Sequence, residues 1–295
     1  MTRASDGDPE LLSVGLTTLD VVHRAAAPPP VNTKITAERQ DVAAGGPAAN
    51  AAVVAQSLGV PATLVTAVGH SPVAAAARAD LRARGVRVLD TAPEHDLAVS
   101  AIVVSQESGQ RTVTSLDSGR SDPVWPDQAG LGSPAVVLID GHYSHLALAA
   151  AEHARACGAL VVLDAGRWRE VFAELLPQAD IAAASADFTL PGGDRGAAAL
   201  VRAGARMGVV TDGAAAVQFA TAREHGQVPV PAVPARDTLG AGDTFHGALA
   251  ASLALRGRVD GAPVAALQDA VRVAAHRVGR IGPRSFLADL PPVGR

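Results

Sequence analysis

The sequence predicts an α/β protein whose main sheet is doubly wound and mostly parallel. Its short apolar runs, most of them rich in β-branched residues, are bounded by Gly, Pro, Asp or helix-like stretches, which is typical of buried parallel strands. These runs cover residues 11–15, 62–66, 136–140, 160–164, 181–184 and 208–211. Stretches of helical composition separate them, at residues 48–58, 73–84, 144–156 and 196–203. Such alternation favours helices on both faces of one sheet.

The helix expected at 144–156 carries its own start and stop signals. Ser144 is a suitable N-cap, because a serine hydroxyl can accept a hydrogen bond from a free N–H group of the first turn. Gly158 can adopt the left-handed conformation that commonly ends a helix. We therefore expect this helix to begin and end at these two residues.

Two segments break the alternation, at 31–44 and 97–116. Both have β character with polar interruptions, and the turn ESGQ at 107–110 predicts a hairpin within the second. We expect them to form a small β lid that stands off the main sheet. The tracts at 25–30 and 121–127 are expected to be connections.

Composition and charge limit the domain organisation and the possible partners. A chain of 295 residues, 48% hydrophobic and 18% charged, predicts a single globular domain over 11–295 after a flexible tail at 1–10. A net charge of −4 provides no general attraction for nucleic acid or an anionic membrane. No apolar run approaches the ~20 residues of a membrane span, and no secretory signal begins the chain. The lone Cys157 excludes a disulfide framework, so we expect a cytoplasmic protein with a small-molecule partner.

The segment DTLGAGDTFHGALA (237–250) indicates a site for anionic chemistry. Gly240 and Gly242 permit a tight turn close to a ligand, and the first N–H groups of the following helix favour phosphate. Asp243 is then well placed to accept a proton from a hydroxyl that attacks the phosphate. The alternative interpretation is that Asp243 is only a helix N-cap.

A second glycine motif, AGGPAANAA (44–52), places Asn50 one turn inside an expected helix behind Gly45 and Gly46. By itself it is compatible with an ordinary loop and helix start. Asp20 is expected just beyond the first strand, at the edge where α/β sheets bind ligands, although it also suits a plain turn. A carboxylate, an amide and bare backbone together favour a polyol ligand.

The two glycine motifs, in this order and about 190 residues apart, resemble the signatures of the ribokinase or PfkB carbohydrate kinases. The resemblance runs from about residue 11 to about residue 290. It implies a ribokinase-like fold and transfer of the γ-phosphate of ATP, with Mg²⁺, to a sugar hydroxyl. Within the family the chain is most similar to the ketohexokinase and sulfofructose kinase branch, through GGPAANAA, GAGDTFHGALA and the segment SGQRTVTSLDSG around Arg111.

The resemblance also implies roles for individual residues. Asp243 would be the general base, with an anion hole made of the amides of Gly240, Ala241 and Gly242. The sugar would be bound by Asp20, Gly45, Gly46 and Asn50 and contacted by Asp140. Arg111, on the lid hairpin, would reach the sugar or the phosphate. Asp237 and the backbone after Val278 match a site for a monovalent cation, K⁺, found in parts of the family.

The nucleotide segments depart from the family pattern. After the strand ending near Ile181 the family usually carries an Asn and, three residues later, a Glu, whereas AAASADF (182–188) offers Ser185 and Asp187. The loop T-x-G-x-x-G is present as TDGAAA, which keeps Thr211 and Gly213. We expect the nucleotide at these four residues, and the sequence assigns no metal ligands.

Several other classes compete with a sugar kinase. Lys34 is the only lysine and no GxxxxGK[ST] occurs, which excludes a P-loop NTPase, and a Rossmann dehydrogenase would need a G-x-G-x-x-G after the first strand. A nucleoside kinase of the same family and a catalytically silent sugar or nucleotide sensor stay open. The aromatic content of 3% and the absence of aromatic residues from the lid segments favour a sugar. An exposed lid edge predicts a homodimer through the lid.

Overall fold

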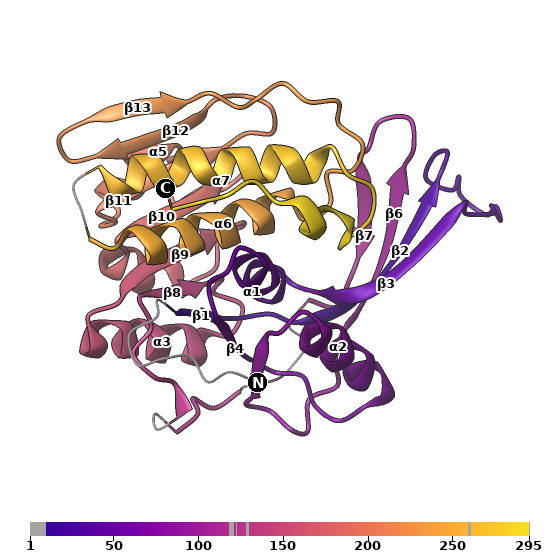
Figure 1. Cartoon of the computed structure of the whole chain (residues 1–295), viewed down its shortest axis with the longest axis horizontal. Helices are drawn as coiled ribbons and strands as arrows, with labels where there is room; N and C mark the ends of the chain where they lie inside the picture. Colours follow the sequence, from indigo (N-terminus) through magenta and orange to yellow (C-terminus); the bar gives the residue numbers. More distant parts are fainter. Residues whose placement is uncertain (1–9, 118–120, 122, 128–129, 259–260, 295) are drawn as a thin grey trace.

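The computed structural model describes residues 10–117, 121, 123–127, 130–258 and 261–294, so the predicted tail at 1–10 lies almost entirely outside the described residues. Its centre is a nine-stranded sheet in the order β13-β12-β11-β10-β9-β8-β1-β4-β5 (Figure 1). The strands are β1 (Leu11–Val14), β4 (Ala62–Thr66), β5 (Arg87–Asp90), β8 (Val136–Ile139), β9 (Leu160–Ala165), β10 (Ile181–Ser185), β11 (Met207–Thr211), β12 (Val217–Thr221) and β13 (His225–Val228). All neighbours from β11 to β5 are parallel, and only β12 and β13 are antiparallel.

Two layers of helices cover the sheet, as the alternation predicts. One face carries α1 (Pro47–Ser57), α2 (Pro72–Ala83), α6 (Ala241–Arg256) and α7 (Ala262–Val278). The other carries α3 (Ser144–Cys157), α4 (Phe172–Leu175) and α5 (Ala197–Arg202). Burial on both faces explains why β8 is a continuous apolar run and why β1 contains a single polar residue, Ser13. The prediction of a doubly wound, mostly parallel sheet is confirmed.

The ends of α3 test the two capping predictions. Gly158 ends the helix in the left-handed conformation with φ 75°, as expected. Ser144 is not the N-cap, because Tyr143 occupies that position with extended backbone and Ser144 is the first helical residue. The helix therefore begins without a side-chain cap.

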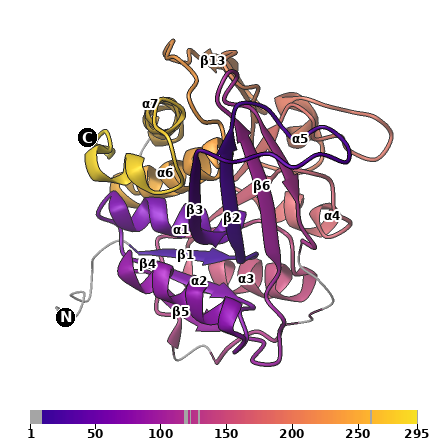
Figure 2. The same cartoon turned by 90° about the vertical axis from the view of Figure 1, so that its right-hand side faces the viewer.

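The lid is a four-stranded sheet in the order β3-β2-β6-β7 that stands away from the main sheet (Figures 1 and 2). Its strands are β2 (Thr18–Ala25), β3 (Arg39–Gly45), β6 (Val99–Ser105) and β7 (Arg111–Thr114). The predicted hairpin within 97–116 is confirmed. The prediction for 31–44 is wrong in its first half, since residues 31–38 contain no strand, and β2 was missed. A half-exposed lid strand lacks the continuous apolar run that marks the buried strands.

The lid has an inner and an outer face. Val22, Ile102 and Val104 on the inner face are buried and pack with Leu239 of the segment before α6. Register pairs Val21 with Val42 on the opposite, outer face, where Val42 is 50% exposed. Among the described residues, no helix combines the length and the apolar composition needed to cross a membrane.

Candidate active site

The two glycine motifs meet at the start of α6. Gly240, with φ 67°, is the N-cap residue, and Asp243 is on the first helical turn. The Asn50 Nδ2 atom, on the first turn of α1, donates a hydrogen bond to Asp243 Oδ2 at 2.7 Å. No side chain caps α6, so the interpretation of Asp243 as merely an N-cap is wrong. The carboxylate is held at the positive end of the helix by an amide from a distant element.

Close packing of α1 against α6 brings Asn50 and Asp243 together. Gly247 lies on the α6 face that contacts α1, and a Cβ atom there would meet the Ala51 carbonyl oxygen at 2.5 Å. Because glycine has no Cβ, the two backbones can approach closely. Gly247, one turn beyond Asp243, therefore sets the separation of the helices that carry Asn50 and Asp243.

Arg284 orients the Asn50 amide from the other side, and the sequence analysis missed it. Its Nη1 atom donates to Asn50 Oδ1 at 3.0 Å, and its Nη2 atom donates to the Ala44 carbonyl at 2.6 Å and contacts Asp80 Oδ2 at 3.0 Å. With the amide oxygen bound to a guanidinium, the Asn50 NH₂ group faces Asp243. No local motif marks Arg284, because its partners are far away in the sequence.

Asp20 faces the second motif from the lid. It lies inside β2 and not in a loop beyond the first strand, which corrects the expected position. A Cβ at Gly45 would meet the Asp20 Cγ atom at 2.1 Å, and one at Gly46 would meet the Leu16 carbonyl oxygen at 2.3 Å. Burial raises the pKa of Asp20, although a 2.7 Å hydrogen bond from Thr18 Oγ1 works in the opposite direction.

A pocket joins these residues. Its lining includes Asp20, Asn50, Gly240 and Arg284. A larger cavity of about 410 Å³ lies elsewhere, against the first residues of β9, β10 and β11. Ligands of open α/β sheets bind at the carboxyl ends of the strands. The smaller pocket, next to Asp243, is therefore the candidate site.

Asp140 follows β8, with its side chain only 1% exposed. Its carboxylate accepts hydrogen bonds from the backbone N–H groups of Leu16 at 2.8 Å, Ala48 at 3.2 Å and His142 at 3.0 Å. These bonds tie the loop after β1 to the start of α1. In the structure, Asp140 therefore stabilises the backbone around the second glycine motif. Its contact with a sugar stays a prediction.

Arg111 lies farther from the pocket than the other predicted sugar residues. It begins β7, is exposed, and pairs with Val104 of β6, whereas Asp20 pairs with Ser100 of the same strand. Four residues of strand separate the two positions, or about 13 Å. The structure does not bring Arg111 beside Asp20, so its reach to a sugar or phosphate stays a prediction.

A charged network that the sequence analysis missed lies next to Asp140. His142 is 3.0 Å from Asp140 Oδ1 through Nδ1 and 3.0 Å from Asp117 Oδ1 through Nε2, and Arg169 Nη2 is 3.0 Å from Asp117 Oδ2. Burial disfavours the charged imidazole, but the two carboxylates outweigh it and raise the pKa of His142 to about 9. The charged imidazole thus joins the segment after the lid to the end of β8.

The four residues expected at the nucleotide lie together. Ser185 and Thr211 pair at the carboxyl ends of β10 and β11, and Asp187 N–H donates to Ser185 Oγ at 3.1 Å. Gly213 follows in the turn before β12, with φ 52°. They form a second polar edge beside the strands that α6 covers.

A buried histidine–aspartate pair connects α6 to that edge. His246, one turn after Asp243, lies 3.1 Å from Asp164 Oδ2 through Nδ1 and 3.2 Å from the Ala183 carbonyl of β10 through Nε2. Burial raises the pKa of Asp164 to about 6, although His246 acts in the opposite direction. These contacts place the start of α6 between the pocket beside Asp243 and the polar ends of β10 and β11.

The family is shown by the sequence itself. The model of the pfkB family carbohydrate kinases matches residues 8–289, nearly the whole chain. The chain belongs to this family. It is therefore a carbohydrate kinase, a phosphotransferase with an alcohol group as acceptor, and membership implies the use of ATP.

Solved structures of family members share the fold. A provisionally named ribokinase from Agrobacterium tumefaciens has a TM-score of 0.82 at 24% identity, covering 98% of this chain and 95% of that one. A ribokinase from Arabidopsis thaliana, solved with ribose and ATP, has a TM-score of 0.74 at 20% identity, covering 97% and 96%. An aminoimidazole riboside kinase from Salmonella enterica has a TM-score of 0.74 at 21% identity, covering 97% of each. The fold is ribokinase-like.

Proposed function

We propose that this kinase transfers the γ-phosphate of ATP to a hydroxyl of a small carbohydrate, a ketose or related sugar of the kind used by the ketohexokinase and sulfofructose kinase branch. One observation carries the proposal. Asp243, at the start of α6, is bound by Asn50 at 2.7 Å beside a pocket that also contains Asp20. This arrangement supplies a proton acceptor, phosphate-binding backbone and hydroxyl-binding groups within one site.

Asp243 is the proposed general base. Its carboxylate accepts the proton of the attacking hydroxyl, while the N–H groups at the start of α6 stabilise the charge on the transferring phosphoryl group. Of the three proposed anion-hole amides, Ala241 N–H already makes a long 3.3 Å bond to the Thr238 carbonyl, so the amides of Gly240 and Gly242 are proposed to contribute most. Asn50 holds the carboxylate in place and would bind a sugar hydroxyl with its neighbours.

The nucleotide is proposed to lie along Thr211, Gly213, Ser185 and Asp187. Mg²⁺ binds phosphates with several waters and only one or two protein carboxylates, and it supplies charge neutralisation of the phosphates. The described residues contain no cluster of three or more His, Cys, Asp or Glu that could hold a metal by themselves. A single carboxylate, Asp187, with the Ser185 hydroxyl fits a metal that the phosphates mostly coordinate.

The pocket lining favours a sugar over a nucleoside. Phe286 is the only aromatic residue among the described residues that line it, and the Arg277 guanidinium lies over the Phe286 ring, 5.1 Å from its centroid. A nucleobase usually stacks on an aromatic ring, and the Arg277 guanidinium already lies over this one. A nucleoside substrate stays the alternative for this chain, because the similar structure from Salmonella enterica is an aminoimidazole riboside kinase.

The experiment is ATP consumption with Mg²⁺ across ketoses, aldoses, sugar acids and nucleosides, with Asp243→Asn measured in parallel. We expect activity on one class of sugar and a loss of at least ~10²-fold in kcat in Asp243→Asn, because the hydroxyl loses its proton acceptor. Asp194→Asn, which removes a carboxylate that is 64% exposed, is the control and should keep full turnover.

Three outcomes would contradict the proposal. Near wild-type turnover in Asp243→Asn would contradict the assignment of Asp243 as the general base. Turnover of nucleosides alone would favour the nucleoside kinase. Sugar or ATP binding by calorimetry without any turnover would favour a catalytically silent sensor.

We also propose that the chain forms a homodimer through the outer face of the lid. Val42 and Val99 lie on that face and are 50% and 41% exposed. Exposed valines on β3 and β6, the two strands that flank β2, give two copies an apolar surface to share.

A further inference from the structure

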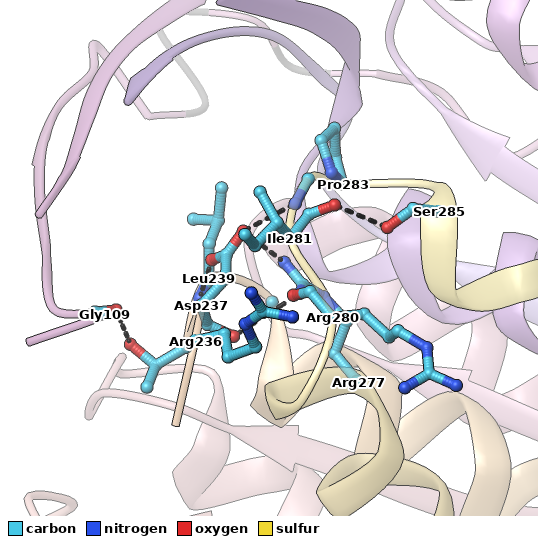
Figure 3. Close-up of polar contacts among 12 residues, drawn as sticks. Gly109, Arg236, Asp237, Leu239, Arg277, Arg280, Ile281, Pro283 and Ser285 are labelled. Carbon is cyan, nitrogen blue, oxygen red and sulfur yellow. Dashed lines mark hydrogen bonds and ion pairs between the residues drawn. The ribbon is translucent and has the colours of Figure 1, made fainter. Parts of the chain in front are cut away.

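A buried ion pair lies directly before the catalytic helix. Arg277 of α7 and Asp237 each have a side chain that is only 2% exposed, and Arg277 Nη2 lies 3.3 Å from Asp237 Oδ2 (Figure 3). Arg277 Nη1 also donates to the Arg280 carbonyl at 3.0 Å and to the Asp237 carbonyl at 3.4 Å. A guanidinium is thus enclosed by one carboxylate and two backbone carbonyls.

The same carboxylate joins two segments of the chain. Asp237 Oδ1 accepts a hydrogen bond from Leu239 N–H at 3.0 Å, and Asp237 Oδ2 accepts one from Gly282 N–H at 2.9 Å. Asp237 N–H in turn donates to the Val278 carbonyl at 3.2 Å. These bonds fix the turn that leads to Gly240, and therefore the direction of the N–H groups that begin α6.

Asp237 and the backbone after Val278 are the residues at which the family resemblance implies a monovalent cation. A bound K⁺ would need these oxygens as ligands, but the Arg277 guanidinium already contacts the Asp237 carboxylate and the carbonyls of Asp237 and Arg280. Two positive charges a few ångströms apart in a buried site repel each other strongly. Burial lowers the pKa of Arg277, yet a guanidinium stays protonated in proteins. The residues present do not fit a monovalent ion.

We propose that Arg277 is a built-in cation that replaces the monovalent ion and makes this kinase independent of K⁺. Arg277 is a positioning residue. It holds the turn from Asp237 to Gly240 through the carboxylate and the two carbonyls, and it acts on the reaction through the α6 amides. The catalytic part of this inference rests on the proposed function, whereas the occupation of the site by a guanidinium does not.

The test compares wild type with Arg277→Ala in KCl and in choline chloride at equal ionic strength, by thermal unfolding and by turnover. We expect the wild-type Tm and kcat to be the same in both salts. Arg277→Ala opens a cation-sized space among three oxygens, so its Tm in KCl should exceed that in choline chloride, and guanidinium at low millimolar concentration should act like K⁺. Its kcat should fall by ~10-fold to ~10²-fold in choline chloride and recover in part with K⁺, while KM changes less.

Two further variants separate positioning from general stability. Arg277→Lys keeps a cation at the site and should stay indifferent to K⁺. Arg256→Ala removes a different arginine, which is half-buried at the far end of α6 and lies 2.9 Å from the buried Asp269. This variant should have a lower Tm that does not respond to K⁺. Both comparisons use Tm, so they decide the inference even if no sugar is turned over.

The inference would be overturned if K⁺ raised the kcat or the Tm of the wild type by more than it raises those of Arg256→Ala. So would an Arg277→Ala protein that folds and responds to neither K⁺ nor guanidinium. If Arg277→Ala does not fold, the wild type and Arg277→Lys decide. Indifference of both to K⁺ supports a built-in cation, and a K⁺ response in either contradicts it.

Discussion

The His142 imidazole lies between the carboxylates of Asp140 and Asp117 and connects the lid to the main sheet. Its pKa is raised to about 9, above the ~6.5 of an unfolded chain. A raised folded-state pKa means that its stabilising contribution is fully present below about pH 6.5 and is lost as pH rises through about 9. We expect the free energy of unfolding to fall on the order of 3 kcal/mol across this window, measured by urea denaturation.

His142→Gln is the control for this pH dependence. A glutamine can still bridge two oxygens but carries no charge, so the variant should be less stable at pH 6.5 and show a flatter profile up to pH 9. If the wild type and His142→Gln lose stability in parallel over this window, the histidine is not the group responsible.

At the scale of elements, the contact between α1 and α6 depends on one glycine. Gly247→Ala would place a Cβ atom 2.5 Å from the Ala51 carbonyl oxygen, so the helices must separate. Alanine favours a helix interior by up to ~1 kcal/mol over glycine, but overpacking typically costs about 1–3 kcal/mol. We expect a net loss of stability together with reduced kcat, because Asn50 and Asp243 move apart.

Gly279→Ala is the matched control for that substitution. Gly279 ends α7 with φ −77°, and an added Cβ would have its nearest atom at 3.6 Å. Urea denaturation and turnover should be unchanged in Gly279→Ala. Equal behaviour of the two alanine variants would show that the Gly247 contact does not set the helix spacing.

The sequence predicts best those elements that are buried and mostly apolar. The strand expected at 62–66 is found at Ala62–Thr66, and the two glycine motifs meet as their chemistry suggested. The lid strand β2 was missed because its polar residues interrupt the apolar pattern. Arg277 and Arg284 were missed because their partners are brought near only by tertiary packing, Asn50 being 234 residues from Arg284. A local sequence pattern does not reveal such long-range contacts.

At the scale of the whole molecule, the proposed dimer depends on the outer face of the lid. Val42→Glu combined with Val99→Glu would bury two charges in the interface, which is costly without partners. We expect light scattering at micromolar concentration to report a dimer for the wild type and a monomer for the double variant. Val233→Glu changes a valine outside the lid that is 39% exposed and should leave the dimer intact. A monomeric wild type would refute the proposal.

The long sequence separations within the site have a consequence for folding. Asn50 and Asp243 are 193 residues apart, and Ala44 and Arg284 are 240 residues apart. Closing such long loops is slow, and these contacts form only when α1, α6 and the segment after α7 have all docked. A partly folded molecule can therefore contain most of its strands and helices without the contact between Asn50 and Asp243. On the proposed function, ATP turnover is therefore expected to return during refolding later than the secondary structure does.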